Sequence, residues 1–223
     1  HGENLSRFGD VVFCSINHRL GALGYSQLSA AGGHPASGNV GNLDMVASLE
    51  WIRDNSANFG GDPGNVTIIG QSGGGAKVTT LMNMPSAKGL FHKAVALSGS
   101  SLSGTNKEFA EKVGLKIMEE AGLKPGDIKG LQKLTWREYI DIANKAAAKM
   151  GDEAKRMNIA RAGFSPVGDG QYLASGEFFK DSSHFSADIP LLINTTFHEQ
   201  SSSRTDSSLE KINLSGVKEK LRS

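Results

Sequence analysis

A serine flanked by glycines is the strongest chemical signal in the sequence. Residues 70–74 read Gly-Gln-Ser-Gly-Gly, with the apolar run 66–69 before them and a helical pattern over 73–83 after them. A serine hydroxyl attacks only when its proton is taken and its line of approach is open. A sharp turn from strand to helix opens that line, because the strained backbone projects the side chain outward. We therefore predict that Ser72 is a nucleophile.

The same turn would stabilise negative charge. The first N–H groups of a helix point outward at its positive end, so we expect the N–H of Gly73 to donate to an oxyanion. We also expect the turn to need small residues at Gly70 and Gly74. One alternative is a structural turn with a bystander serine. Another is a phosphate-binding loop, but the required Lys-Ser/Thr is missing because Lys77, which we expect to be solvated, precedes Val78.

The elements that must position Ser72 alternate between strand and helix. Runs rich in β-branched or apolar residues predict parallel strands over 11–17, 66–69, 93–97 and 189–194. Apolar residues at helical spacing predict a helix over 42–57, capped by Asn42. This alternation is typical of an α/β protein with a mostly parallel sheet and helices on both faces.

The middle of the chain has a different composition. Residues 106–149 are rich in Lys, Glu and Ala at helical spacing, which predicts helices outside the sheet. We divide the chain into a core over 1–105, a helical insertion over 106–163, and a return to the core over 164–223. The last segment ends in a predicted helix from about residue 206, with Leu209, Ile212 and Val217 on one side.

Composition excludes several classes of protein. Hydrophobic residues make up 38% and charged residues 21% of the 223 residues, with a net charge of +1. Nothing here favours nucleic acid or an anionic membrane surface, and no apolar stretch is long enough to cross a membrane. The single cysteine, Cys14, permits no internal disulfide, and we expect it to be a buried free thiol. We expect Trp51 and Phe59 to lie in the core.

Several ordered segments resemble one family. They are Asn-His-Arg-Leu-Gly (17–21), Gly-Asn-Val-Gly-Asn-Leu-Asp (38–44), Asn-Phe-Gly-Gly-Asp-Pro (58–63), the serine turn (70–74), Leu-Ser-Gly-Ser (97–100) and Phe-Ser-Pro-Val-Gly-Asp-Gly (164–170). Together they resemble the type-B carboxylesterases, which include bacterial p-nitrobenzyl esterases and cholinesterases, and the bacterial branch is more similar. The resemblance implies an α/β-hydrolase fold, a small-molecule carboxylic ester as substrate, an acyl-enzyme at Ser72, and no metal or organic cofactor.

The resemblance also implies supporting residues. Glu199 falls on the family's catalytic glutamate, in the segment after the strand at 189–194. Its alternative is an ordinary surface glutamate, and Asp169 is a rival acid whose Gly-Asp-Gly turn favours a structural role. Gln71 and Ser98 would lie just behind the reacting groups, although Ser98 could equally be a simple turn serine.

Arg19 and Asp44 lie in segments that the family joins by a salt bridge, which we expect to be buried and to cost about 3–5 kcal/mol to break. The alternative is two separate surface charges.

The sequence departs from the family in two places. The family's triad order is serine, acid, histidine, and all six histidines of this chain precede Glu199. The family's His-Gly-Gly-Gly oxyanion loop is also missing, and the spacing to residue 11 argues against Gly2 as its remnant. We therefore expect an internal piece of a larger enzyme, truncated at both ends, with apolar surfaces uncovered. The alternative is a non-catalytic binding module of the same fold.

Overall fold

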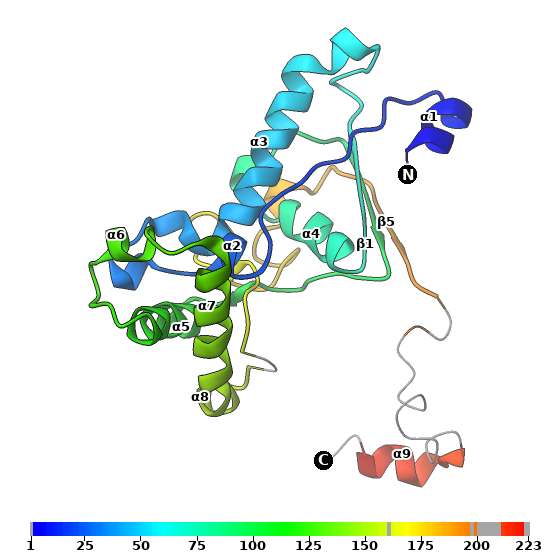
Figure 1. The fold of residues 1–223 in the computed structure, drawn as a ribbon. Coiled ribbons are helices and arrows are strands. Elements are labelled where there is room, and N and C mark those ends of the chain that lie inside the picture. The colour runs from blue at the N-terminus through cyan, green and yellow to red at the C-terminus, as the bar shows by residue number, and fades with distance from the viewer. Residues whose placement is uncertain (1, 160–161, 197–198, 200–210, 221–223) are drawn as a thin grey trace.

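The computed structural model describes residues 2–159, 162–196, 199 and 211–220, and the larger sheet among them has three parallel strands (Figure 1). The strand order is β1 (Thr67–Gln71), β2 (Lys93–Leu97) and β5 (Leu191–Asn194). In-register parallel pairing places Gln71 beside Leu97 and Leu97 beside Asn194. The segments that follow the three strands therefore leave the sheet at the same edge, where open parallel sheets hold their sites.

Helices α3 (Val40–Asn55) and α4 (Gly73–Leu81) pack in one apolar core with the sheet face that carries Ile68, Ala94 and Ala96. The helices contribute Met45, Val46, Leu49, Val78 and Leu81 to this core. Ile69 of β1 and Leu192 of β5 lie outside this core, and each is 55% exposed. The predicted strands at 66–69, 93–97 and 189–194 and the helix after Ser72 are confirmed.

The predicted helical segment is also confirmed. It contains α5 (Lys107–Glu120), α6 (Ile128–Leu131), α7 (Trp136–Lys149) and α8 (Gly151–Arg156). These helices share a second apolar core, in which Phe109, Ile117 and Ala143 are fully buried. Ala22 and Ala31 belong to this second core although they precede the sheet in sequence. The division at residues 105 and 163 stays a prediction.

The remaining elements are short. Helices α1 (Glu3–Gly9), α2 (Gly21–Tyr25) and α9 (Leu214–Lys220) lie towards the ends of the chain. The strands β3 (Thr105–Asn106) and β4 (Val167–Gly168) form a separate parallel pair. Short 3-10 turns occur at Ser29–Ala31, Pro35–Asn39, Ser56–Phe59, Pro85–Ala87 and Ser183–Phe185.

The predicted tail helix appears only as α9, and Leu209 lies outside the described residues. Among the helices that the structure describes, none is long and apolar enough to span a membrane.

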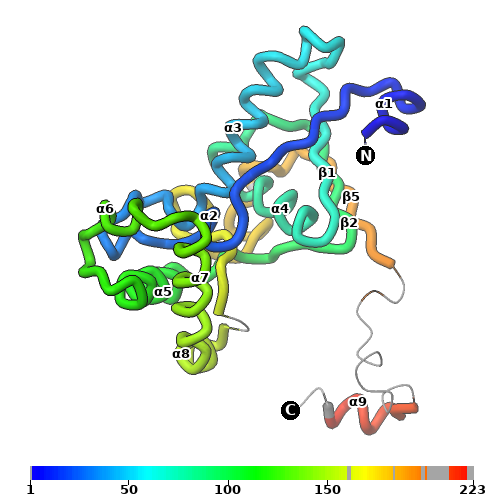
Figure 2. Tube along the Cα trace, in the orientation of Figure 1, coloured from blue at the N-terminus to red at the C-terminus, as the bar shows by residue number. Residues whose placement is uncertain are grey.

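The predicted strand over 11–17 is wrong. The segment runs as an extended trace between α1 and α2 without a ladder partner among the described residues (Figure 2). Val11, Val12, Phe13 and Ile16 are all exposed. A strand exists only through hydrogen bonds to a neighbour, so an apolar, β-branched sequence alone does not make one.

Three predictions of buried side chains are also wrong. Cys14 is exposed, Trp51 is 52% exposed and Phe59 is 63% exposed. The two aromatic rings lie with centroids 6.1 Å apart, at the carboxyl end of α3 and in the turn after it. With Val11, Phe13 and Ile16 they leave an apolar surface uncovered, as the resemblance to a larger protein led us to expect.

Asn42 does not cap α3, because the helix begins two residues earlier, at Val40, after a 3-10 turn. The Asn42 side chain is instead buried and accepts a hydrogen bond from the Tyr25 hydroxyl at 3.1 Å.

Candidate active site

Ser72 occupies a one-residue turn between β1 and α4. Its backbone has φ 54° and ψ −120°, a region that a residue with a side chain rarely adopts and that costs on the order of 1–3 kcal/mol. The N–H of Ser72 donates to the carbonyl of Leu97 at 2.8 Å, and its own carbonyl accepts from Ala76 at 3.0 Å. The strand and the helix thus hold the strained conformation from both sides. The side chain is left on the surface at the carboxyl edge of the sheet.

Glycines make this turn sterically feasible. A Cβ built on Gly70 would overlap the backbone of Gly74, and one on Gly75 would overlap the carbonyl of Gly99. A Cβ on Gly99 would in turn overlap the backbone of Ser72. The Cβ position of Gly74 itself is open, so a methyl group would fit there, and our expectation that this position needs a small residue stays a prediction. The close packing depends on Gly70, Gly75 and Gly99.

The segments after β2 and β5 adjoin the same edge. Ser98 directly follows β2 with φ 52°, and its N–H donates to the carbonyl of Asn194 at 2.7 Å. Gln71 is exposed at the end of β1. Glu199 lies five residues beyond the end of β5 and is partly buried. Residues 197, 198 and 200 lie outside the described residues, so the roles of Glu199, Gln71 and Ser98 stay predictions.

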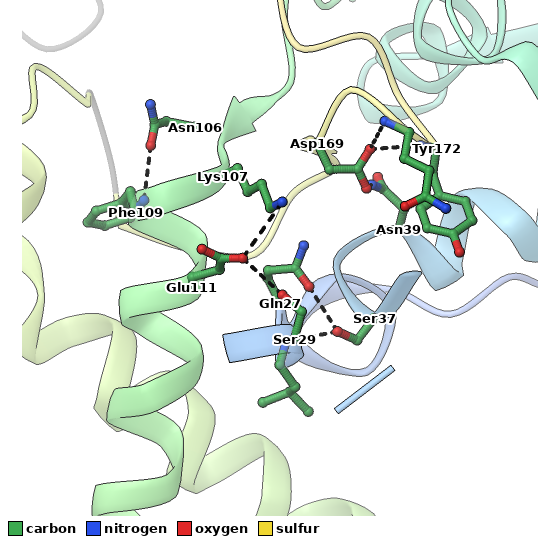
Figure 3. Close-up of polar contacts among 12 residues, drawn as sticks. Gln27, Ser29, Ser37, Asn39, Asn106, Lys107, Phe109, Glu111, Asp169 and Tyr172 are labelled. Atoms are coloured by element: carbon green, nitrogen blue, oxygen red, sulfur yellow. Dashed lines mark hydrogen bonds and ion pairs between the residues drawn. The ribbon is translucent and has the colours of Figure 1, made fainter. Parts of the chain in front are cut away.

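Asp169 is fully engaged in a structural turn. Its Oδ1 accepts the N–H groups of Gln171, Tyr172 and Leu173 at 2.9, 2.7 and 3.1 Å. Its Oδ2 accepts from Asn39 Nδ2 at 2.9 Å (Figure 3). A carboxylate with both oxygens committed in this way is poorly suited to orient a histidine. The geometry agrees with the structural role that its Gly-Asp-Gly setting favoured.

Asn39 is a buried polar residue that we did not predict. Its Nδ2 donates to the carbonyl of Val167 at 2.8 Å, and its Oδ1 accepts from the N–H of Val167 at 3.1 Å. The side chain thus replaces a strand partner for β4 and joins the start of α3 to the 164–170 segment. The only available signal was that both residues fall in segments that resemble the family.

Arg19 and Asp44 form an ion pair. Arg19 donates to the carboxylate through its backbone N–H and Nε, both at 2.9 Å, and through Nη2 at 2.7 Å. These hydrogen bonds hold the pKa of Asp44 below its usual value. The side chains are 55% and 26% exposed, so the expectation of a buried pair is wrong. Its contribution to stability is that of a well-oriented surface pair, about 0.5–1 kcal/mol.

The substitution Asp44→Asn should lower the free energy of unfolding by about 0.5–1 kcal/mol at neutral pH. The folded state lowers the pKa of Asp44. This stabilisation is therefore present above the pKa of the unfolded state, about 3.9, and is lost as pH falls through the lower pKa of the folded state. Urea titrations should therefore give the unchanged protein and Asp44→Asn the same free energy of unfolding in acid. Asp54→Asn, which removes the exposed pair with Arg53, should cost less. If Asp44→Asn remains less stable than the unchanged protein below the pKa of Asp44 in the folded state, the stabilisation does not come from the ion pair with Arg19.

Lys77 of α4 and His18 are both partly buried basic side chains. Lys77 is partly buried, which lowers the pKa of its amine. Both ring nitrogens of His18 are buried without a hydrogen-bond partner among the described residues. Burial first, and the positive charge of Lys77 second, lower the pKa of His18, whereas the charge of Asp44 opposes them.

The strained serine, its glycines and the parallel sheet agree with a family-level match. The model of the carboxylesterase family matches residues 1–222. The chain belongs to this family. It is 35% identical to the Bacillus subtilis para-nitrobenzyl esterase over 198 residues, which are 89% of this chain and 39% of that protein. It is 46% identical to rabbit (Oryctolagus cuniculus) liver carboxylesterase 1 over 124 residues, 55% of this chain and 21% of that protein.

Solved structures give the same fold. A carboxylesterase of Geobacillus stearothermophilus superposes with a TM-score of 0.76 at 31% identity, over 99% of this chain and 44% of that chain. The carboxylesterase-family chain therefore has the α/β-hydrolase fold, with the sheet, the turn at Ser72 and the helical segment as parts of it. It spans less than half the length of these relatives.

Proposed function

We propose that this carboxylesterase-family chain carries the nucleophile and the acid of a serine hydrolase that cleaves carboxylic esters. The observation that carries the proposal is the conformation of Ser72, with φ 54° between β1 and α4 and an exposed side chain. Strain of this kind persists only where the surroundings enforce it, and it is common at catalytic residues. Membership of the carboxylesterase family supports the reaction class.

In the proposed reaction the Ser72 oxygen attacks the carbonyl carbon of the ester while a base takes its proton. The N–H of Gly73, at the start of α4, donates to the oxyanion. The alcohol leaves with that proton, and water then releases the acid from the acyl-enzyme. Glu199 orients the base, and Gln71 and Ser98 support the turn and the acid. No metal or organic cofactor takes part.

The base in this scheme is a histidine that this chain does not supply. None of the six histidines follows Glu199, where the triad order of the fold would put it. Loss of one triad member costs orders of magnitude in rate. We therefore assign the activity to the full-length gene product, with this chain contributing Ser72, Gly73 and Glu199.

Labelling with a fluorophosphonate tests the proposal. This reagent reacts with a serine only where the serine is activated, so the folded full-length gene product should be modified at Ser72 and the Ser72→Ala variant should not. Ser103→Ala, which changes an exposed serine after β2, should label as the unchanged protein does. Turnover of p-nitrophenyl acetate should fall by about 10³-fold or more in Ser72→Ala. A folded protein that does not label, with equal turnover in both forms, would favour the binding-module alternative.

A further inference from the structure

The ammonium group of Lys77 lies beside the residue proposed to hold the oxyanion. Lys77 is one turn into α4, and its Nζ donates to the carbonyl of Gly73 at 3.3 Å. A Cβ built on Gly73 would lie 3.9 Å from the same nitrogen. The side chain therefore turns back towards the start of the helix instead of extending into solvent. Its positive charge therefore lies beside the first turn of α4.

This position is unfavourable for the helix itself. The start of a helix already carries a partial positive charge, so a cation there is repelled. Burial adds a second cost, which the lowered pKa of the amine reflects. Among the described residues, no carboxylate lies within 4.0 Å of Nζ to compensate. The ammonium thus has one carbonyl partner among the described residues and no carboxylate that neutralises its charge.

The groups around Lys77 do not neutralise its charge either. Burial first, and the positive charge of Lys77 second, lower the pKa of His18, whose ring nitrogens have no hydrogen-bond partner among the described residues. Asp44, the carboxylate that acts on His18, is committed to three hydrogen bonds from Arg19. The region around the start of α4 therefore has a net positive character that the neighbouring described residues do not neutralise.

We propose that Lys77 stabilises the oxyanion of the esterase reaction through space, by its charge and without touching the substrate. This inference rests on the proposed function of Ser72 and Gly73. When Ser72 attacks, the carbonyl electron pair moves to the oxygen, and the N–H of Gly73 donates to the new charge. The Lys77 ammonium lowers the energy of that charge until the pair returns and the alkoxide leaves, protonated by the base. Lys77 is thus a positioning and electrostatic residue.

Steady-state kinetics of the full-length gene product on p-nitrophenyl acetate, a neutral ester, provide the test. Lys77→Met should lower kcat about tenfold with KM within about twofold, because the charge acts mainly in the transition state. Lys77→Arg should recover most of kcat. Lys129→Met, which removes an exposed lysine of α6, should change neither constant. Thermal unfolding of Lys77→Met should not occur at lower temperature, since a poorly placed cation is removed.

The pH profile supplies a readout that a structural role would not change. Burial lowers the pKa of the Lys77 amine, so kcat should fall at alkaline pH as the ammonium loses its proton. This fall should be absent in Lys77→Arg, because the guanidinium stays charged.

An unchanged kcat in Lys77→Met, or the same alkaline fall in Lys77→Arg, would overturn the inference while Ser72 still labels with a fluorophosphonate. A KM rise confined to esters that carry a carboxylate would overturn it in favour of substrate recognition. If Ser72 does not label, the proposed function fails and this inference fails with it.

Discussion

Replacing Gly70 with alanine should destabilise this chain by about 3 kcal/mol or more. The added Cβ would overlap the backbone of Gly74, and backbone atoms cannot rotate away as a flexible side chain can. Relief would require β1 and α4 to separate, which would break the hydrogen bonds that the backbone of Ser72 makes to Leu97 and Ala76. The strained conformation of Ser72 would then relax, so the proposed activity would be lost together with the local structure.

The neighbouring substitution Gly74→Ala is the matched control. It adds the same methyl group four residues away, at a helical position with no atom within 4 Å. Alanine favours a helix over glycine, so the stability should stay the same or rise by up to about 1 kcal/mol. Urea denaturation of the 223-residue chain, followed by circular dichroism, measures both variants. Equal effects of the two substitutions would show that the packing described for Gly70 is wrong.

The turn at Ser72 could be predicted from the sequence because its causes are local. A β-branched run, a glycine-flanked serine and a helical pattern follow one another within residues 66–83, and each element forms where that order requires it. The need for Gly99 was not visible in the same way. It arises from the contact between Gly99 and the backbone of Ser72, two segments that meet only because β1 and β2 pair.

Burial was harder to predict because it depends on the partner and not on the residue alone. The segment 11–17 and the aromatic side chains of Trp51 and Phe59 have the composition of a core. In the structure they stay largely exposed and belong to neither apolar core. Sequence patterns report that a residue favours an apolar partner, but they do not report whether the chain provides one. The exposed ion pair of Arg19 and Asp44 illustrates the same limit for charges.

The role of Asn39 depends on a contact that no local pattern encodes. Asparagine is common in turns and at helix starts, and residues 35–39 form such a turn before α3. Its partner Val167 lies 128 residues later in the chain. Only the fold brings them together, and there the side chain satisfies both backbone groups of a residue that is itself buried.

Because of this pairing, Asn39→Ala should lower the free energy of unfolding by about 3–5 kcal/mol. The substitution leaves the N–H and C=O of Val167 buried without partners, and each such group costs about 1–3 kcal/mol. It also removes the hydrogen bond to Asp169, whose carboxylate organises the turn over 169–173. Chemical denaturation of the full-length gene product provides the measurement. The control is Asn55→Ala, which removes an exposed hydrogen bond to the carbonyl of Trp51 and should cost well under about 1 kcal/mol.

An aspartate at position 39 separates the hydrogen bonds from the packing. Asn39→Asp keeps the shape of the side chain but replaces both donors to Val167 and Asp169 with an oxygen. At neutral pH the new carboxylate would lie next to that of Asp169. Asn39→Asp should therefore lower the free energy of unfolding at least as much as Asn39→Ala does. As pH falls, protonation of one carboxyl would restore a donor, and the deficit relative to the unchanged protein should shrink. If Asn39→Asp is tolerated at neutral pH, the side chain does not make the donor contacts that join α3 to β4.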